Sequence, residues 1–187
     1  MIGAITAGLF STGAAAGGGT SYESIATANG TGSSGVITFS SIPSTFKHLQ
    51  IRMTGRGTVA STNIEGYITF NGSSSSYYQG HQLFGDGATA YSQSSSGTTS
   101  GWSTFMTANS ATANVNGVGI VDILDYADTN KYKTTRTLTG YDLNGSGLII
   151  FRSNLWQNTA AINSISFTTS AANFDSTTKF ALYGIRG

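Results

Sequence analysis

The sequence has no cysteine, a single proline (Pro43) and two histidines among its 187 residues. The lack of cysteine excludes disulfides and thiolate metal sites. Charged residues make up only 9% of the chain, against about 25% in an average globular protein. Nine Lys and Arg spread along the chain do not form the basic stripe of a nucleic-acid-binding protein, so no nucleic-acid partner is expected.

Hydroxyl and amide side chains take the place of charge. The chain has 26 Ser, 27 Thr, 25 Gly and 12 Asn, and its formal net charge is +1. A weakly charged surface of this kind associates readily, which suits a subunit of an assembly better than an isolated monomer. Aromatic residues reach 11%, and the apolar residues are regularly spaced, so the composition argues for a folded domain rather than disorder.

Residues 1–20 differ from the rest of the chain, and we call them the N-terminal arm. Ile2, Ile5 and Leu9 share one face of a helix, Phe10 follows them, and 13–19 is a Gly- and Ala-rich linker. The apolar stretch is too short to span a bilayer and lacks the basic start of a secretory signal, so no membrane partner is expected. A frayed tail is one interpretation; an arm that docks on a neighbouring subunit is the one we favour.

From residue 21 the pattern changes to short β-rich runs separated by turn residues, which predicts a sandwich or barrel over 21–187. No amphipathic helix is expected after residue 20. Residues 86–101 are rich in Gly, Ser and Thr and are predicted to form a long loop around Tyr91. The predicted strands are 36–39, 49–53, 64–70, 77–84, 102–107, 118–126, 132–141, 148–151, 162–168 and 180–185.

Four Asn-Gly pairs favour tight hairpin turns, because Asn and Gly tolerate positive φ angles. They lie at 29–30, 71–72, 116–117 and 144–145.

The last predicted strand is among the most apolar stretches of the sequence. Alternation places Phe180 and Leu182 on one side of it and Ala181 and Tyr183 on the other. Such a run near the chain end requires pairing inside a sheet, and we expect its partner around 22–27. Gly184 would allow a bulge or a close approach there.

The sequence offers little material for catalysis. His48 and His81 are the only histidines, and they are interpreted as surface or cross-strand hydrogen-bonding residues rather than as general bases. No nucleophile elbow, phosphate-binding loop or legible pair of carboxylates is present. We therefore expect a non-enzymatic protein without a cofactor.

Asp122, Asp125 and Asp128 are spaced by three, with Asn130 close behind. Their oxygens could serve a hard cation such as calcium. The preferred interpretation is a strand end followed by a turn, in which Asp and Asn side chains bond their own backbone, and no metal is expected.

Aromatic residues gather around the predicted loop. Tyr77, Tyr78, Tyr91 and Trp102 are candidates for a loop that grips a partner protein or stacks on the sugar rings of a host-surface glycan. The alternative is that every second aromatic residue fills the core.

Several segments over roughly residues 20–187 resemble, as a set, a family of small virion structural proteins from tailed phages, cyanophages among them. They are 22–27 (YESIAT), 42–52 (IPSTFKHLQIR), 122–134 (DILDYADTNKYKT), 155–162 (LWQNTAAI) and 180–187 (FALYGIRG).

The resemblance implies an all-β, jelly-roll-like β-sandwich that assembles with other virion proteins in the host cytoplasm. It also implies a homo-oligomer, with a trimer as the expected form, and no catalytic residues. A capsid decoration, or cement, protein anchored by the arm is the expected role. The alternative is a tail-fibre or spike component whose loops bind a host-surface glycan or receptor.

Overall fold

The fold is an all-β sandwich, seen in a computed structural model that describes residues 21–187. The prediction of a β-sandwich is therefore confirmed. The arm residues Ile2, Ile5, Leu9 and Phe10 lie outside the described residues. Between residues 21 and 187 there is no helix long and apolar enough to cross a membrane.

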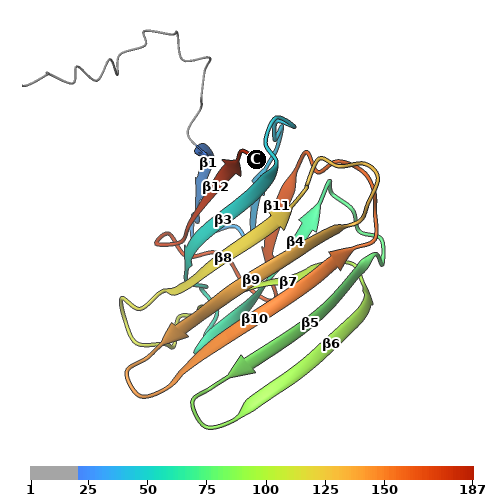
Figure 1. Ribbon diagram of the computed structural model, residues 1–187. Coiled ribbons are helices and arrows are strands. Elements are labelled where there is room, and N and C mark those ends of the chain that lie inside the picture. Colours follow the sequence, from blue (N-terminus) through green and yellow to red (C-terminus); the bar gives the residue numbers. More distant parts are fainter. Residues whose placement is uncertain (1–20) are drawn as a thin grey trace, which may run out of the picture.

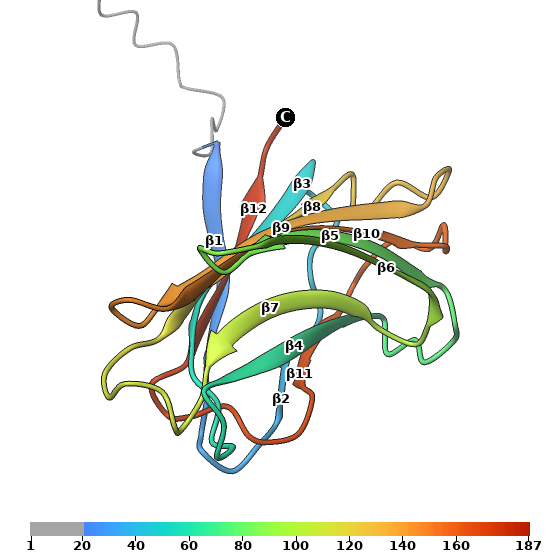
Figure 2. The ribbon, with the colours of Figure 1, turned by 90° about the horizontal axis from the view of Figure 1, so that it is seen from below.

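Two antiparallel sheets of unequal size form the layers. The large sheet has eight strands in the order β1-β12-β3-β8-β9-β10-β5-β6, and the small sheet has four in the order β2-β11-β4-β7. Figure 1 shows the large sheet in front, and Figure 2 shows the small sheet lying beneath it. The strands are β1 (Tyr22–Asn29), β2 (Val36–Phe39), β3 (His48–Gly55), β4 (Asn63–Phe70), β5 (Tyr78–Gly85), β6 (Ala90–Thr98), β7 (Gly101–Thr107), β8 (Gly117–Leu124), β9 (Lys133–Asp142), β10 (Gly147–Trp156), β11 (Ile165–Thr169) and β12 (Lys179–Ile185).

The chain pairs its strands in a nested way. The outermost strands of the chain, β1 and β12, pair in the large sheet, and the next two inward, β2 and β11, pair in the small sheet. Further inward, β3 pairs with β8 in the large sheet and β4 pairs with β7 in the small sheet. Strands β9, β10, β5 and β6 widen the large sheet beyond β8. Because the small sheet has only four strands, part of this extension reaches past it (Figure 2).

Alternation along the strands builds the apolar core between the sheets. In β4 every second residue is buried, which turns Ile64, Ile68 and Phe70 inward. Strands β3, β8 and β12 supply the opposing layer. The main core residues are Ile37, Phe39, Leu49, Ile51, Met53, Ile64, Ile68, Phe70, Val121, Ile123, Trp156, Ile165, Phe167, Phe174, Phe180 and Leu182.

The last strand follows the prediction closely. β12 pairs with β1 from Tyr22 opposite Ile185 onward, and with β3 on its other side, so it lies inside the sheet. Phe180 and Leu182 are fully buried in the core. Gly184 allows a close approach, since a Cβ there would come within 2.3 Å of the Phe46 ring.

Two local predictions are wrong. Residues 86–101 are mainly strand, because β6 (Ala90–Thr98) pairs with β5 along the edge of the large sheet. The Ser and Gln side chains of β6 gave no strand pattern in the sequence, and the segment is extended because it pairs with β5. Of the four Asn-Gly pairs, only those at 71–72 and 144–145 have positive φ at both residues, and only 144–145 closes a hairpin, between β9 and β10. The pairs at 29–30 and 116–117 begin or end strands instead.

Candidate interaction surface

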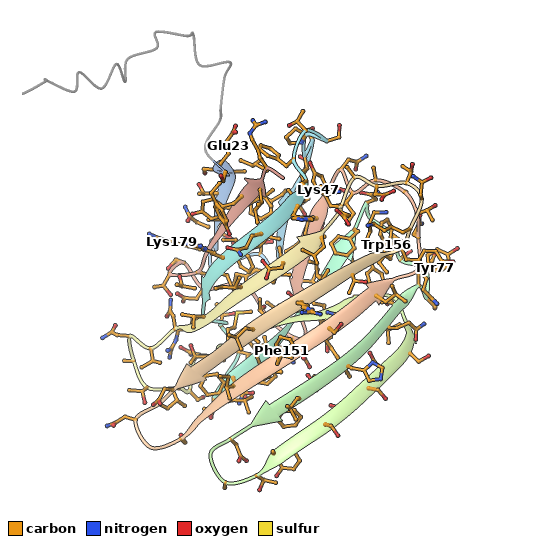
Figure 3. All side chains as sticks on the ribbon, viewed as in Figure 1. Glu23, Lys47, Tyr77, Phe151, Trp156 and Lys179 are labelled. Atoms are coloured by element: carbon orange, nitrogen blue, oxygen red, sulfur yellow. The ribbon has the colours of Figure 1, made fainter. Side chains whose placement is uncertain are left out.

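Six large apolar side chains lie together on the outer side of the large sheet, away from the small sheet. One row of paired residues crosses four strands: Ile120 of β8 is opposite Leu138 of β9, which is opposite Phe151 of β10, which is opposite Leu83 of β5. All four are exposed. Figure 3 labels Phe151 in the middle of this sheet.

The adjacent row alternates large and small residues. Val118 of β8 is followed by Gly140 of β9, Ile149 of β10 and Gly85 of β5. Ile149 is the most exposed of the six large side chains, at 61%. The missing side chain at Gly140 leaves a shallow, largely apolar groove of about 520 Å³. We call the six residues Leu83, Val118, Ile120, Leu138, Ile149 and Phe151 the outer apolar face.

Polar side chains border this face on the third row. Asp122, Arg136, Ser153 and His81 stand opposite one another on β8, β9, β10 and β5. The Gln50 amide donates a hydrogen bond of 2.7 Å to Asp122 Oδ1 at the edge of this row. An apolar centre with a polar border is the general make-up of a protein–protein interface.

Strands β9 and β10 of this face turn polar residues inward. On β9, Thr135, Thr137 and Thr139 are buried between the sheets, while Leu138 faces outward. A shift of one residue in register would have exchanged the two sides of the strand. The observed register therefore exposes apolar residues and buries hydroxyls, which is unfavourable for an isolated sandwich unless another surface covers the outer face.

Arg152 is the largest of the buried polar residues. Its guanidinium forms an ion pair with Glu65 of β4 and donates bonds of 2.9 Å to the Ser103 carbonyl and to Gln82 Oε1. Burial lowers the pKa of Arg152, and the Glu65 carboxylate opposes that shift. These bonds join β10 to the small sheet and hold β10 in the register that turns Phe151 outward.

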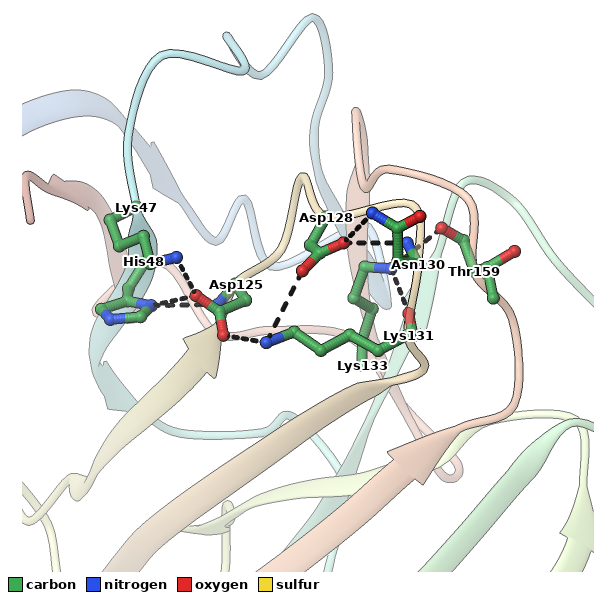
Figure 4. A network of polar contacts seen from close by, with 8 residues as sticks. All are labelled: Lys47, His48, Asp125, Asp128, Asn130, Lys131, Lys133 and Thr159. Atoms are coloured by element: carbon green, nitrogen blue, oxygen red, sulfur yellow. Dashed lines mark hydrogen bonds and ion pairs between the residues drawn. The ribbon is translucent and has the colours of Figure 1, made fainter.

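A second polar network lies at the end of β8, in the turn after it (Figure 4). Asp125, with φ of 48°, forms ion pairs with Lys47 and Lys131, and these two ammonium groups lower its pKa to about 2. Asp128 Oδ1 accepts a 2.8 Å bond from the backbone N–H of Asn130, as the turn interpretation predicted. Asp122 does not join them, since it lies on the outer side of β8. Among residues 21–187 no three His, Asp or Glu side chains gather as a metal site would require.

The two histidines lie on different strands of the large sheet. His48 begins β3, and its Nδ1 accepts a 2.9 Å bond from the backbone N–H of Asp125, the cross-strand role that was predicted. His81 is exposed on β5, with β8, β9 and β10 between it and β3.

The four aromatic candidates for a partner-binding loop are not brought together. Tyr78 is only 1% exposed; its hydroxyl accepts a 2.8 Å bond from the Phe70 N–H, and its ring stacks near Trp156. It is a core residue, and its assignment to a binding loop was wrong because alternation turns it inward at the first position of β5. Trp102 is half-buried on β7, Tyr91 stacks on Phe84 at the edge hairpin, and Tyr77 is exposed just before β5.

The outer apolar face was not predicted from the sequence. A signal was present, because 118–124 and 148–151 carry apolar residues at both odd and even positions, which marks strands apolar on both faces. The same pattern is typical of a strand that is buried on both faces, so it does not by itself reveal exposure. Comparisons with protein-family models, with curated proteins and with solved structures returned no match.

Proposed function

We propose that this protein is a non-enzymatic structural subunit of a bacteriophage virion, with capsid surface decoration as its role. The structural part of the proposal rests on the outer apolar face, whose six large apolar side chains are 40–61% exposed side by side. Contiguous exposed apolar patches often mark interaction sites. The proposal that the particle is a bacteriophage virion rests on the resemblance of roughly residues 20–187 to virion proteins of tailed phages.

The topology supports this proposal. The nested pairs β1–β12, β2–β11, β3–β8 and β4–β7, divided alternately between two sheets, agree with a jelly-roll connectivity widened by β9, β10, β5 and β6. Jelly rolls recur in viral capsid domains. The N-terminal arm, which precedes β1 in the chain, would anchor the subunit to the particle.

The test is the location and copy number of the protein in purified particles of the phage that encodes it. Quantitative mass spectrometry and antibody labelling in electron micrographs should find hundreds of copies over the head. A handful of copies at the tail would overturn the decoration role in favour of a tail-fibre or spike component, and isolated protein would then bind host cells and block infection. Absence from particles would overturn the virion role altogether.

The arm is tested separately with a variant that lacks residues 1–12. We expect it to keep the thermal transition of the full chain and to lose incorporation into particles. Unchanged incorporation would refute the anchoring role of the arm.

A further inference from the structure

The outer apolar face has a pattern that matches itself after a half turn. Consider a two-fold axis that lies in the plane of contact, parallel to the strands, between β9 and β10. Rotation about it places β8 over β5 of the second molecule and β9 over β10, with each row kept at its own level. Ile120 then meets the partner's Leu83, and Leu138 meets the partner's Phe151.

The second row supplies projections and holes. The same rotation sets Ile149, the most exposed side chain of the face, over the groove at the partner's Gly140, and it sets Val118 over the partner's Gly85. The hole at Gly140 is enforced, because a Cβ there would come within 2.3 Å of the Leu148 carbonyl oxygen. Large residues therefore meet small ones at every position of this row, as close packing between two sheets requires.

The bordering row is compatible with the same axis. Asp122 of β8 comes to lie over the partner's His81, and Arg136 over the partner's Ser153. An acidic group thus meets an imidazole, and no two like charges face each other within the row. Complementary charge at a rim fixes register and discourages wrong pairings.

A perpendicular in-plane axis at the level of Leu138 gives a poor match. It would reverse the order of the rows, so the apolar row of Val118 and Ile149 would lie over the row of Asp122 and Arg136. That arrangement buries charges against aliphatic side chains, which is costly without partners. A perpendicular axis midway between the two apolar rows would set Phe151 over the partner's Ile149, large on large, whereas the parallel axis sets Ile149 over a glycine; the packing therefore favours the parallel axis.

The size of the face sets the scale of the contact. Four strands spaced about 4.8 Å apart, each contributing about six residues, make a surface roughly 20 Å square, the polar row included. This outline of about 400 Å² is about half of the roughly 800 Å² that each partner buries in a standard protein interface, so the proposed dimer is a small one.

We propose that a second copy of this chain covers the outer apolar face, packed sheet on sheet about the two-fold axis between β9 and β10. This inference does not rest on the virion assignment. A two-fold contact builds a dimer, so the trimer implied by the family resemblance would need a different surface.

The absence of native cysteine allows a direct test of this geometry by thiol cross-linking. In the full-length double variant Ile120→Cys/Leu83→Cys, each cysteine faces the other type in the partner. Sheets that pack face to face lie about 10 Å apart, beyond the roughly 7 Å Cα separation that a disulfide allows, so the reagent is a short bifunctional maleimide that spans the gap. We expect covalent dimers of the double variant and not of either single variant, in which the two cysteines of a dimer are also three strands apart, about 14 Å sideways. No covalent dimer of the double variant, or efficient dimer formation by Ile120→Cys alone, would overturn the proposed axis.

Mass measurement tests the contact without relying on cysteine. Light scattering of the full chain at tens of micromolar should give a dimer, and a wild-type monomer or trimer would overturn the proposal. Ile149→Asp and Gly85→Leu should both give monomers, the second because it fills the hole for Val118 at a position where a Cβ meets only the Thr89 carbonyl oxygen, at an ordinary contact distance of 3.8 Å. Val36→Asp is the matched control: Val36 is similarly exposed, but it lies on β2 of the small sheet, and its variant should stay dimeric.

Discussion

Phe151 and Arg152 are consecutive residues of β10 with environments opposite to their chemistry: Phe151 is 48% exposed on the outer apolar face, and Arg152 is 1% exposed between the sheets. The ion pair with Glu65 and the bonds to Ser103 and Gln82 satisfy the buried guanidinium. The same bonds fix the register that exposes Phe151. Core stability and the interaction surface are therefore linked through one strand.

Replacing Arg152 by methionine should strongly destabilise the fold. The change leaves the Glu65 carboxylate without its ion pair and the Ser103 carbonyl without a donor, and breaking a buried pair in this way costs about 3–5 kcal/mol. Chemical denaturation measures the loss. Lys179→Met, at an exposed position of β12, is the control and should stay within about 0.5 kcal/mol of the wild type. Equal small effects of both changes would contradict the role given to Arg152.

Tyr78 should make stability fall at high pH. Burial raises the pKa of its hydroxyl to about 12, from an ordinary value of 10.0. The folded state thus favours the protonated form, so this contribution is complete below pH 10 and is lost as the pH rises toward 12. Between pH 9 and 12, the melting temperature should fall less steeply with rising pH for Tyr78→Phe than for the wild type. Identical slopes would show that the hydroxyl is accessible to solvent, as a partner-binding loop would require.

Asp125 should make the stability of the fold depend on pH at acid pH. Its carboxylate has a pKa lowered to about 2 by Lys131 and Lys47, so it stabilises the fold above pH 3.8 and this contribution is lost as the pH falls toward 2. We expect Asp125→Asn to lower the melting temperature at pH 6 and to converge with the wild type near pH 2. Because the lysines are half-exposed, the difference at pH 6 should shrink in high salt. A difference that is constant across pH would exclude the ion pairs as its cause.

The C-terminal strand should be indispensable. Truncation after Lys179 removes Phe180 and Leu182 from the core and leaves β1 and β3 without the strand that joins them. We expect the truncated chain to lose its cooperative thermal transition in circular dichroism. In the full-length chain, Gly184→Ala should also destabilise the fold, because the added methyl group overlaps the Phe46 ring. Removal of Gly187 alone is the control and should be tolerated.

Much of the sandwich could be predicted from local pattern. β2 was predicted at its observed bounds, and the pairing of β12 with the strand at 22–27 followed from an apolar alternating run that had to be buried. β6 could not be found this way, since its Ser-rich sequence has weak strand preference and is extended only because β5 offers an edge to pair with.

The candidate surface was harder to predict, because it depends on which side of each strand faces the core. On β9 the sequence alternates Thr with Arg136 and Leu138, and a rule that buries apolar residues would turn Leu138 inward. The structure turns the threonines inward because β10 must bury Trp156 and pair Arg152 with Glu65, and β9 follows its register. Contacts with other strands therefore decide which side of β9 faces the core, and the local sequence of β9 does not determine it.

Protection of the outer apolar face in solution is the most direct test of the proposed dimer. Hydroxyl-radical footprinting of the full-length protein measures the reactivity of Phe151 and Leu138, with Tyr132 as an exposed reference. Both residues should react several-fold less in the wild type than in the Ile149→Asp variant, while Tyr132 should react equally in the two. Equal reactivity of Phe151 and Leu138 in both proteins would show that nothing covers this face, and it would contradict the proposed dimer.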